Sequence, residues 1–388
     1  MLRSPWLWIT ITLIVAGLAL TAALGVLTWL IALLGAAVLL SLGVFIHAAF
    51  AVGQAQPPVL PQLTRRPGDR RMRLIYDCDV TLGRPFHSVG DGLALLYLLG
   101  EPNIDLRAVT TTYGNGSVGM TTRTARHLLD TLNLHHVVVA RGAGRPDGDP
   151  SQNEAARTLV EAADGSPDEI IVLATGPLTN LKHASMLDPH FLEKLRGLYL
   201  MGGVMGASGE LTWNERRLVE RNFSSDPEAA YLAIHSDCPT TIVPGETGLT
   251  AVFRSPQFAA LQGLHGPVPR LIARRIRLWY GLMRVWFRDD GFPLWESIAA
   301  LAVTHPDLFE FRRAHLPITV EDLHRGRLVT DPRRAGPVRL VSGVREFETF
   351  IEIQLAAWQR LNLLMIEPGT TSVERNDLAP DPKESEPL

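Results

Sequence analysis

A long uncharged apolar run near the N-terminus constrains the fold of this chain more than any other feature. From Pro5 to Val52 the sequence contains no Asp, Glu, Lys or Arg. One membrane-spanning helix needs ~20 apolar residues, and this run is more than twice as long. We therefore expect residues 1–53 to form a transmembrane hairpin of two helices, at about 6–24 and 27–50, with a turn near Gly25.

Basic residues flank the apolar run on both sides. Arg3 precedes it, and five arginines follow it between residues 65 and 73. Because positive charge collects on the cytoplasmic side of a membrane, we expect both ends of the hairpin and the following domain to be cytoplasmic. A cleaved signal peptide has a much shorter apolar core. The sequence thus predicts a two-span membrane protein with the lipid bilayer as a partner.

The remaining chain divides by composition into a linker, a domain and a tail. Residues 54–71 are rich in Pro and Arg and predict an extended linker. Residues 367–388 lack apolar periodicity and predict a disordered tail, so a folded domain spans about 72–366. The net charge is −3 with no polybasic block, which argues against nucleic acid as a partner.

Within residues 72–366, strand-like and helix-like segments alternate. Helical spacing is clear at residues 91–99 and 121–132. The expected strands are residues 73–76, 106–112, 136–140, 169–173, 197–201 and 240–243. This alternation predicts an α/β fold with a mostly parallel sheet flanked by helices. In such folds, the chemistry collects at the carboxyl ends of the strands.

Polar side chains follow several of these expected strands. Oxygen-bearing side chains on one rim of a sheet could bind a polyhydroxylated ligand or a hard cation such as Ca²⁺. Taken singly, such a residue is more often a turn or a helix cap than a functional group, and the ordered set is what favours a site. The candidates are Asp77, Asp79, Asn115, Thr175 and Asn180, followed by Asn214, Glu220 and Asn222.

Five ordered motifs give the chain a resemblance to a known family. They are Asp77-Cys78-Asp79 with Gly90-Asp91, residues 110–115 (TTTYGN), residues 175–180 (TGPLTN), residues 200–203 (LMGG), and Asn214 with Glu220-Arg221-Asn222 and residues 226–230 (DPEAA). From about Met72 to Leu363 the chain resembles the inosine/uridine-preferring nucleoside hydrolases. The resemblance implies Ca²⁺-assisted hydrolysis of the N-glycosidic bond of a ribonucleoside or related N-ribosyl compound, giving free base and ribose for purine or pyrimidine salvage.

The resemblance also implies a role for each matching residue. Asp79 is expected to be the catalytic base. The expected Ca²⁺ ligands are Asp79, Asp91, Thr175 through its carbonyl, and Glu296. The expected substrate-binding residues are Asn214, Glu220, Asn222 and Trp295, and the residues expected to support them from behind are Asp77 and Asn115.

Two positions depart from the family's motifs. Gly90 stands where the family has the first of two adjacent Asp residues, after a longer loop from residue 80 to 90. Trp295-Glu296 stands where the family has His-Asp, and Trp295 could either stack on a base or pack in the core. These departures leave open a catalytically weak or inactive ribosyl-binding membrane sensor or scaffold. A homo-oligomer also stays open.

Overall fold

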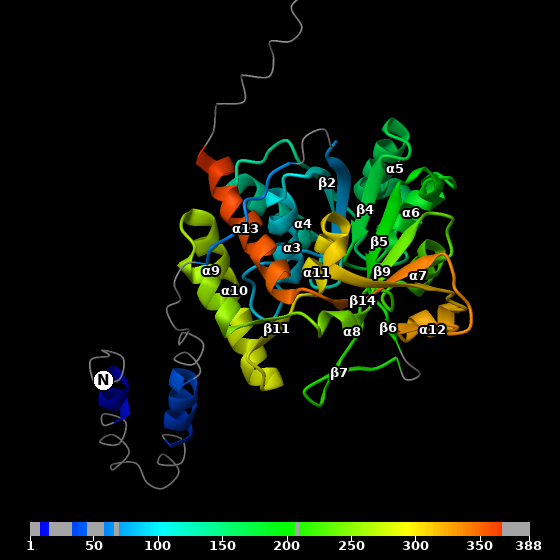
Figure 1. The fold of residues 1–388 in the computed structure, drawn as a ribbon. Coiled ribbons are helices and arrows are strands. Elements are labelled where there is room, and N and C mark those ends of the chain that lie inside the picture. The colour runs from blue at the N-terminus through cyan, green and yellow to red at the C-terminus, as the bar shows by residue number, and fades with distance from the viewer. Residues whose placement is uncertain (1–7, 15–32, 45–57, 66–69, 206–208, 367–388) are drawn as a thin grey trace, which may run out of the picture.

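The computed structural model describes residues 8–14, 33–44, 58–65, 70–205 and 209–366. An eight-stranded sheet forms the centre of the domain, in the order β12-β14-β9-β5-β4-β1-β2-β3. Neighbouring strands run parallel, apart from the antiparallel pair β12 and β14 (Figure 1). The predicted mostly parallel α/β sheet is therefore confirmed.

All six strands expected from sequence belong to this sheet. They are β1 (Met72–Cys78), β2 (Ile104–Thr111), β3 (Val138–Arg141), β4 (Ile170–Ala174), β5 (Gly197–Met201) and β9 (Thr240–Val243). Two further strands of the sheet, β12 (Phe309–Ala314) and β14 (Val338–Val344), were not predicted from the sequence. Arginines interrupt both segments, so neither reads as a buried apolar run. Short two-stranded pairs lie outside the sheet: β6 (Val204–Met205) with β13 (Arg327–Leu328), β7 (Leu211–Trp213) with β8 (Arg216–Leu218), and β10 (Val252–Arg254) with β11 (Gly291–Pro293).

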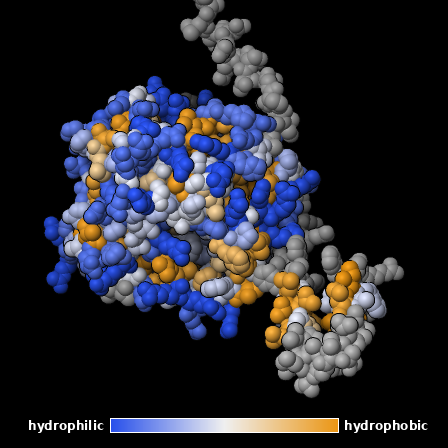
Figure 2. All heavy atoms as spheres, turned by 180° about the vertical axis from the view of Figure 1, so that it is seen from behind, coloured by the Kyte–Doolittle hydropathy of each residue, from blue (hydrophilic) through white to orange (hydrophobic). Residues whose placement is uncertain are grey.

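Helices cover both faces of the sheet and enclose two apolar cores. Successive β1 side chains alternate between the cores: Leu74 and Tyr76 enter one, and Ile75 enters the other. The first core is closed by α3 (Gly90–Gly100), α4 (Val118–Thr131), α9 (Ser255–Gly263), α10 (Pro267–Phe287), α11 (Trp295–Thr304) and α13 (Phe347–Ile366). The second is closed by α5 (Glu154–Gly165), α6 (Thr179–Leu187), α7 (Pro227–Ile234) and α12 (Val320–His324). The domain surface seen in Figure 2 is accordingly mostly hydrophilic.

Local sequence explains where the helices near the pocket begin. Asp226 caps α7 by accepting from the Ala229 amide at 3.1 Å, and Pro227 takes the first turn. The first turns of α3 and α11 each carry a carboxylate, Asp91 and Glu296. A carboxylate is favoured there because the free N–H groups give a helix N-terminus partial positive charge.

The structure does not support the predicted membrane hairpin. Within the predicted spans at 6–24 and 27–50, the described helical segments are residues 8–14 and 33–44; the rest of the spans, and the predicted tail at 367–388, lie outside the described residues. Among the described residues, no helix combines the length and the apolar character needed to cross a bilayer. A span requires ~20 residues in one continuous helix. This finding contradicts the predicted membrane localisation, and nothing in the described part of the chain shows the predicted lipid partner.

Candidate functional site

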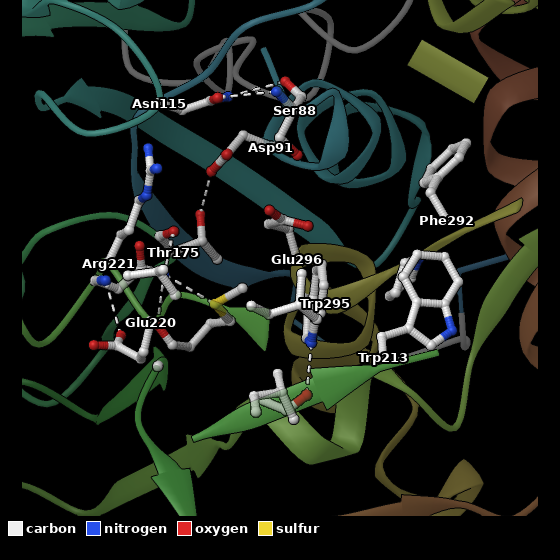
Figure 3. Close-up of a pocket in the computed structure, with 18 of the residues that line it drawn as sticks. Ser88, Asp91, Asn115, Thr175, Trp213, Glu220, Arg221, Phe292, Trp295 and Glu296 are labelled. Atoms are coloured by element: carbon white, nitrogen blue, oxygen red, sulfur yellow. Dashed lines mark hydrogen bonds between the residues drawn. The ribbon is translucent and has the colours of Figure 1, made fainter. Parts of the chain in front are cut away.

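A pocket of about 570 Å³ opens at the carboxyl ends of the central strands. Asp79 follows β1, Thr175 follows β4, and Met201 ends β5, while Asp91 and Glu296 enter from the first turns of α3 and α11. Figure 3 shows Asp91, Thr175 and Glu296 toward one side of the pocket and the rings of Trp213 and Phe292 on the other. The tertiary structure thus brings together one polar wall and one aromatic wall.

Asp79 has a buried carboxylate that is closely surrounded by backbone atoms. The Asn115 backbone N–H donates to its Oδ2 at 2.5 Å. A Cβ on Gly114 would overlap that oxygen, and one on Gly176 would lie 3.3 Å from the Asp79 Cγ. Gly114 also has φ +136°, which L side chains rarely adopt. The glycines of two sequence motifs therefore hold this carboxylate by letting the backbone come close.

Asp91 and Thr175 form a hydrogen-bonded unit beside Asp79. The Thr175 hydroxyl donates to Asp91 Oδ1 at 2.6 Å, and the Tyr76 hydroxyl lies 3.3 Å from the same oxygen. The Thr175 carbonyl, the predicted metal ligand, accepts from the Asn222 side-chain amide at 2.9 Å. Asn222 also donates to the Met201 carbonyl at 2.9 Å, so it ties the ends of β4 and β5 together.

Trp295 and Glu296 both line the pocket. The Trp295 Nε1 donates to the Gly245 carbonyl at 2.6 Å, and its ring fills the space that a Cβ on Gly248 would need. Glu296 is buried, and its Oε2 has no hydrogen-bond partner among the described residues. Trp295 is therefore fixed in position, whereas one buried oxygen of Glu296 could still accept a hydrogen bond.

Burial raises the pKa of every carboxyl group in the polar wall. It raises the pKa of Glu296 to about 8, with the neighbouring Asp91 adding to the shift. It raises the pKa of Asp79 well above the usual 3.8, again helped by Asp91, and the pKa of Asp91 itself rises. Several acids placed together away from water disfavour one another's charge. Such a cluster is stable in its charged form only if a positive charge compensates it.

The oxygen atoms of the polar wall are of the kind that bind a hard cation, but they are not arranged as a complete set of metal ligands. All are oxygen atoms, the ligand type that Ca²⁺ and Mg²⁺ take, and the unpartnered Glu296 Oε2 is one of them. Within the described ranges, however, no three or more His, Cys, Asp or Glu side chains are arranged to hold a metal ion. Oxygens of Asp79 and Thr175 also already accept hydrogen bonds from Asn115 and Asn222.

Of the two residues expected to support the site, Asn115 lines the pocket and Asp77 does not. Asp77 is fully buried behind the pocket, where its Oδ1 accepts from Thr110 and Asn180 at 2.6 and 2.7 Å. Burial raises its pKa to about 6. Asn115 accepts from the Ser88 amide at 2.9 Å and so fastens the loop of residues 80–90 to the pocket.

Glu220 lines the pocket, but its carboxylate is already bonded to the backbone. Oε1 accepts from the amides of Asn222 and Phe223, both at 2.8 Å, and more weakly from Gly203 at 3.3 Å. Oε2 accepts from the Ser224 amide at 2.9 Å. The side chain thus shapes the loop that carries Asn222.

Asn214 is not among the described residues that line the pocket. It forms the two-residue turn between β7 and β8 together with Glu215, and both have positive φ, 45° and 62°. Two such residues form the turn type that suits the twist of a tight hairpin. The Asn214 side chain donates to the Phe287 carbonyl at 3.2 Å, so the structure separates it from the other predicted sugar ligands.

The aromatic wall was largely invisible in the sequence. Trp286 and Phe287 of α10 line the pocket, whereas Tyr280 of the same helix is buried in the core. Trp279 of α10 also lines the pocket. Further lining residues come from other segments: Phe86, Trp213, Arg217, Arg221 and Phe292. No local motif marks them, because only the packing of α10 and the β7–β8 hairpin brings them together.

A family model described as inosine-uridine preferring nucleoside hydrolase matches residues 74–352. The chain is 26% identical to the probable uridine nucleosidase 2 of Arabidopsis thaliana, over 67% of this chain and 85% of that protein. It is 27% identical to the pyrimidine-specific ribonucleoside hydrolase RihA of Shewanella baltica, over 66% of this chain and 86% of that protein.

Solved structures share the fold. A purine-preferring ribonucleoside hydrolase from Gardnerella vaginalis superposes with a TM-score of 0.64 at 21% identity, covering 74% of this chain and 99% of that one. A plant nucleoside hydrolase superposes with a TM-score of 0.63 at 21% identity, covering 75% and 99%.

Proposed function

Because the chain belongs to the inosine-uridine preferring nucleoside hydrolase family, whose members are N-glycosyl hydrolases, we propose that this pocket hydrolyses ribonucleosides to base and ribose with a bound divalent cation, Ca²⁺ being the best candidate. The observation that carries the proposal is the group of three buried carboxylates, Asp79, Asp91 and Glu296, facing an aromatic wall. One wall suits a sugar and a cation, and the other suits a base.

We assign Asp79 as the catalytic general base. Breaking an N-glycosidic bond builds positive charge on the sugar, which nearby carboxylates stabilise. Asp79 would take a proton from the attacking water, while Asp91 and Glu296 supply negative charge beside the sugar. In this assignment, the cation would be held by Asp79, Asp91, Glu296 and the Thr175 carbonyl. A bound cation would lower the pKa of the attacking water and of Asp79 itself.

Substrate positioning falls to the other groups of the pocket. Asn222 lines the pocket beside Thr175 and Met201, where a ribose hydroxyl could replace one of its hydrogen bonds. Asp77 and Asn115 act on the site through their hydrogen bonds rather than by touching the substrate. Base stacking falls to the aromatic wall.

Ribose release by the full chain tests the proposal. Uridine, cytidine, inosine and guanosine are each incubated with and without Ca²⁺, and with a chelator. We expect turnover of at least one nucleoside, its loss with chelator, and its recovery with Ca²⁺. Asp79→Asn should lower kcat by about 10²-fold or more, while Asp105→Asn, on the far end of β2, should not. Undiminished turnover by Asp79→Asn would remove Asp79 as the base.

A further inference from the structure

Gly90 at the start of α3 lies directly against Glu296 at the start of α11. A Cβ at position 90 would overlap Glu296 Oε2 and Cδ and would lie 2.7 Å from Oε1. Separations under 3.0 Å are essentially never found for real Cβ atoms. The Glu296 carboxylate therefore occupies the space that any side chain at residue 90 would fill.

Space, and not backbone conformation, explains the glycine here. Gly90 is absent from the described glycines with positive φ, so its backbone suits any L residue. A glycine in a helix normally costs stability relative to alanine. Glycine at position 90 is thus unfavourable for the helix itself. The Glu296 carboxylate, which leaves no room for a side chain, explains why a glycine is found there.

Packing holds the Glu296 carboxylate in place more than hydrogen bonding does. The side chain is 6% exposed, and its Oε2 is without a partner among the described residues. The N-termini of α3 and α11 both favour negative charge at this point, which is where Asp91 also lies. Figure 3 shows the Glu296 carboxylate directed into the pocket beside Asp91.

We propose that Gly90 and Glu296 form a compensating pair in which Glu296 reaches across from α11 and supplies the carboxylate oxygen that residue 90 lacks. Gly90 is then a positioning residue: its missing side chain sets how deep the Glu296 carboxylate can enter the pocket. This inference rests on the proposed function, since it assigns that oxygen to the substrate and cation site.

A mutant cycle in the full chain tests the pair. The variants are Gly90→Ala, Glu296→Asp and the double variant, and Gly119→Ala is the matched control. Gly119 also lies in the first turn of a helix, α4, but an added Cβ there meets only Arg123 Nη1, at 3.4 Å. The readouts are the Tm with chelator present, Ca²⁺ affinity by calorimetry, and kcat/KM for ribose release.

If the two residues form a pair, the effect of Gly90→Ala should depend on which residue stands at position 296. In the wild-type background, Gly90→Ala should lower the Tm and weaken Ca²⁺ binding and kcat/KM by about 10-fold or more. In the Glu296→Asp background, where the side chain is one methylene shorter, the same change should be neutral or favourable. Gly119→Ala should leave the Ca²⁺ affinity and kcat/KM within about 2-fold and the Tm unchanged or higher.

The outcomes separate this inference from the proposed function. Equal losses from Gly90→Ala in both backgrounds, or no loss in either, would overturn the pair. If Gly90→Ala alone fails to fold, a folded double variant supports the pair, and a double variant that also fails contradicts it. If wild-type protein releases no ribose, the proposed function fails, but the Tm cycle still decides the pair.

Discussion

The side-chain amide of Asn222 donates to the carbonyl oxygen of Thr175 over 2.9 Å. A residue predicted to bind sugar is thereby joined to a residue predicted to bind the cation. The same amide also donates to the Met201 carbonyl, at the end of the neighbouring strand. Asn222 therefore links the substrate side of the pocket to the ends of β4 and β5.

Replacing Asn222 by Asp should damage the site more than replacing the other predicted sugar-binding Asn. The carboxylate cannot donate to the Thr175 and Met201 carbonyls, and two buried acceptors lose their partner. We expect kcat/KM for nucleoside hydrolysis to fall by roughly 10-fold or more.

The matched control is Asn214→Gly. Glycine adopts the positive φ of this hairpin turn readily, so kcat/KM should stay within about 2-fold, since Asn214 lies outside the pocket lining. Similar losses in the two variants would show that Asn214 enters the site during turnover.

Gly114→Ala should displace the proposed base without removing it. The new Cβ would overlap Asp79 Oδ2, and φ of +136° is strained for alanine. A catalytic group moved by about 1 Å can lose on the order of 100-fold in rate, so we expect a loss of that size in kcat. Gly165→Ala is the control, since an added Cβ there meets nothing within 4 Å among the described residues. A fully active Gly114→Ala would mean that the Asp79 position is not critical.

Metal-free protein should lose stability as the pH rises from about 4 to 8. The pKa of Glu296 is raised to about 8 and that of Asp77 to about 6 in the folded state. Between the ordinary pKa and the raised one, the folded protein binds more protons than the unfolded chain, so the free energy of unfolding falls with increasing pH. For Glu296 this window runs from 4.5 to about 8.

Urea unfolding at a series of pH values, with chelator, measures this slope. Glu296→Gln should flatten the curve between pH 6 and 8, because the group that titrates there is gone. Adding Ca²⁺ should raise the stability most at high pH, where the carboxylates need compensation. A stability that rises with pH over this range would contradict the burial of these acids.

Trp286→Ala should weaken nucleoside binding more than it slows the chemistry. Trp286 lines the pocket mouth with 62% of its surface exposed. Stacking of a base on an aromatic ring is worth about 1–3 kcal/mol, and the exposure of this ring places it at the low end. We expect KM to rise roughly 5-fold with little change in kcat. Val285→Ala is the neighbouring control, since Val285 is also exposed but is not among the residues lining the pocket.

The sequence alone determined six of the eight strands of the sheet and the polar residues that follow them. Buried strands such as β4 and β5 are recognisable as short apolar runs. A polar residue that follows such a run lies at the edge of the parallel sheet formed by the carboxyl ends of its strands. That relation is local, so Asp79 and Thr175 could be placed from sequence. The family resemblance then placed Asp91, Asn222 and Glu296 near the same rim.

Only the tertiary structure decided which of these groups meet and what surrounds them. Asn214 shares a motif with Asn222, yet it forms a hairpin turn because two consecutive residues there take positive φ. The aromatic wall arises where helix α10 packs beside the β7–β8 hairpin, and no sequence spacing encodes that contact. Hydropathy reports composition, whereas spanning a bilayer requires one continuous helix of sufficient length, and no helix among the described residues meets that requirement. Gly90 and Glu296 are far apart in the sequence, and only the packing of the folded chain brings them into close contact.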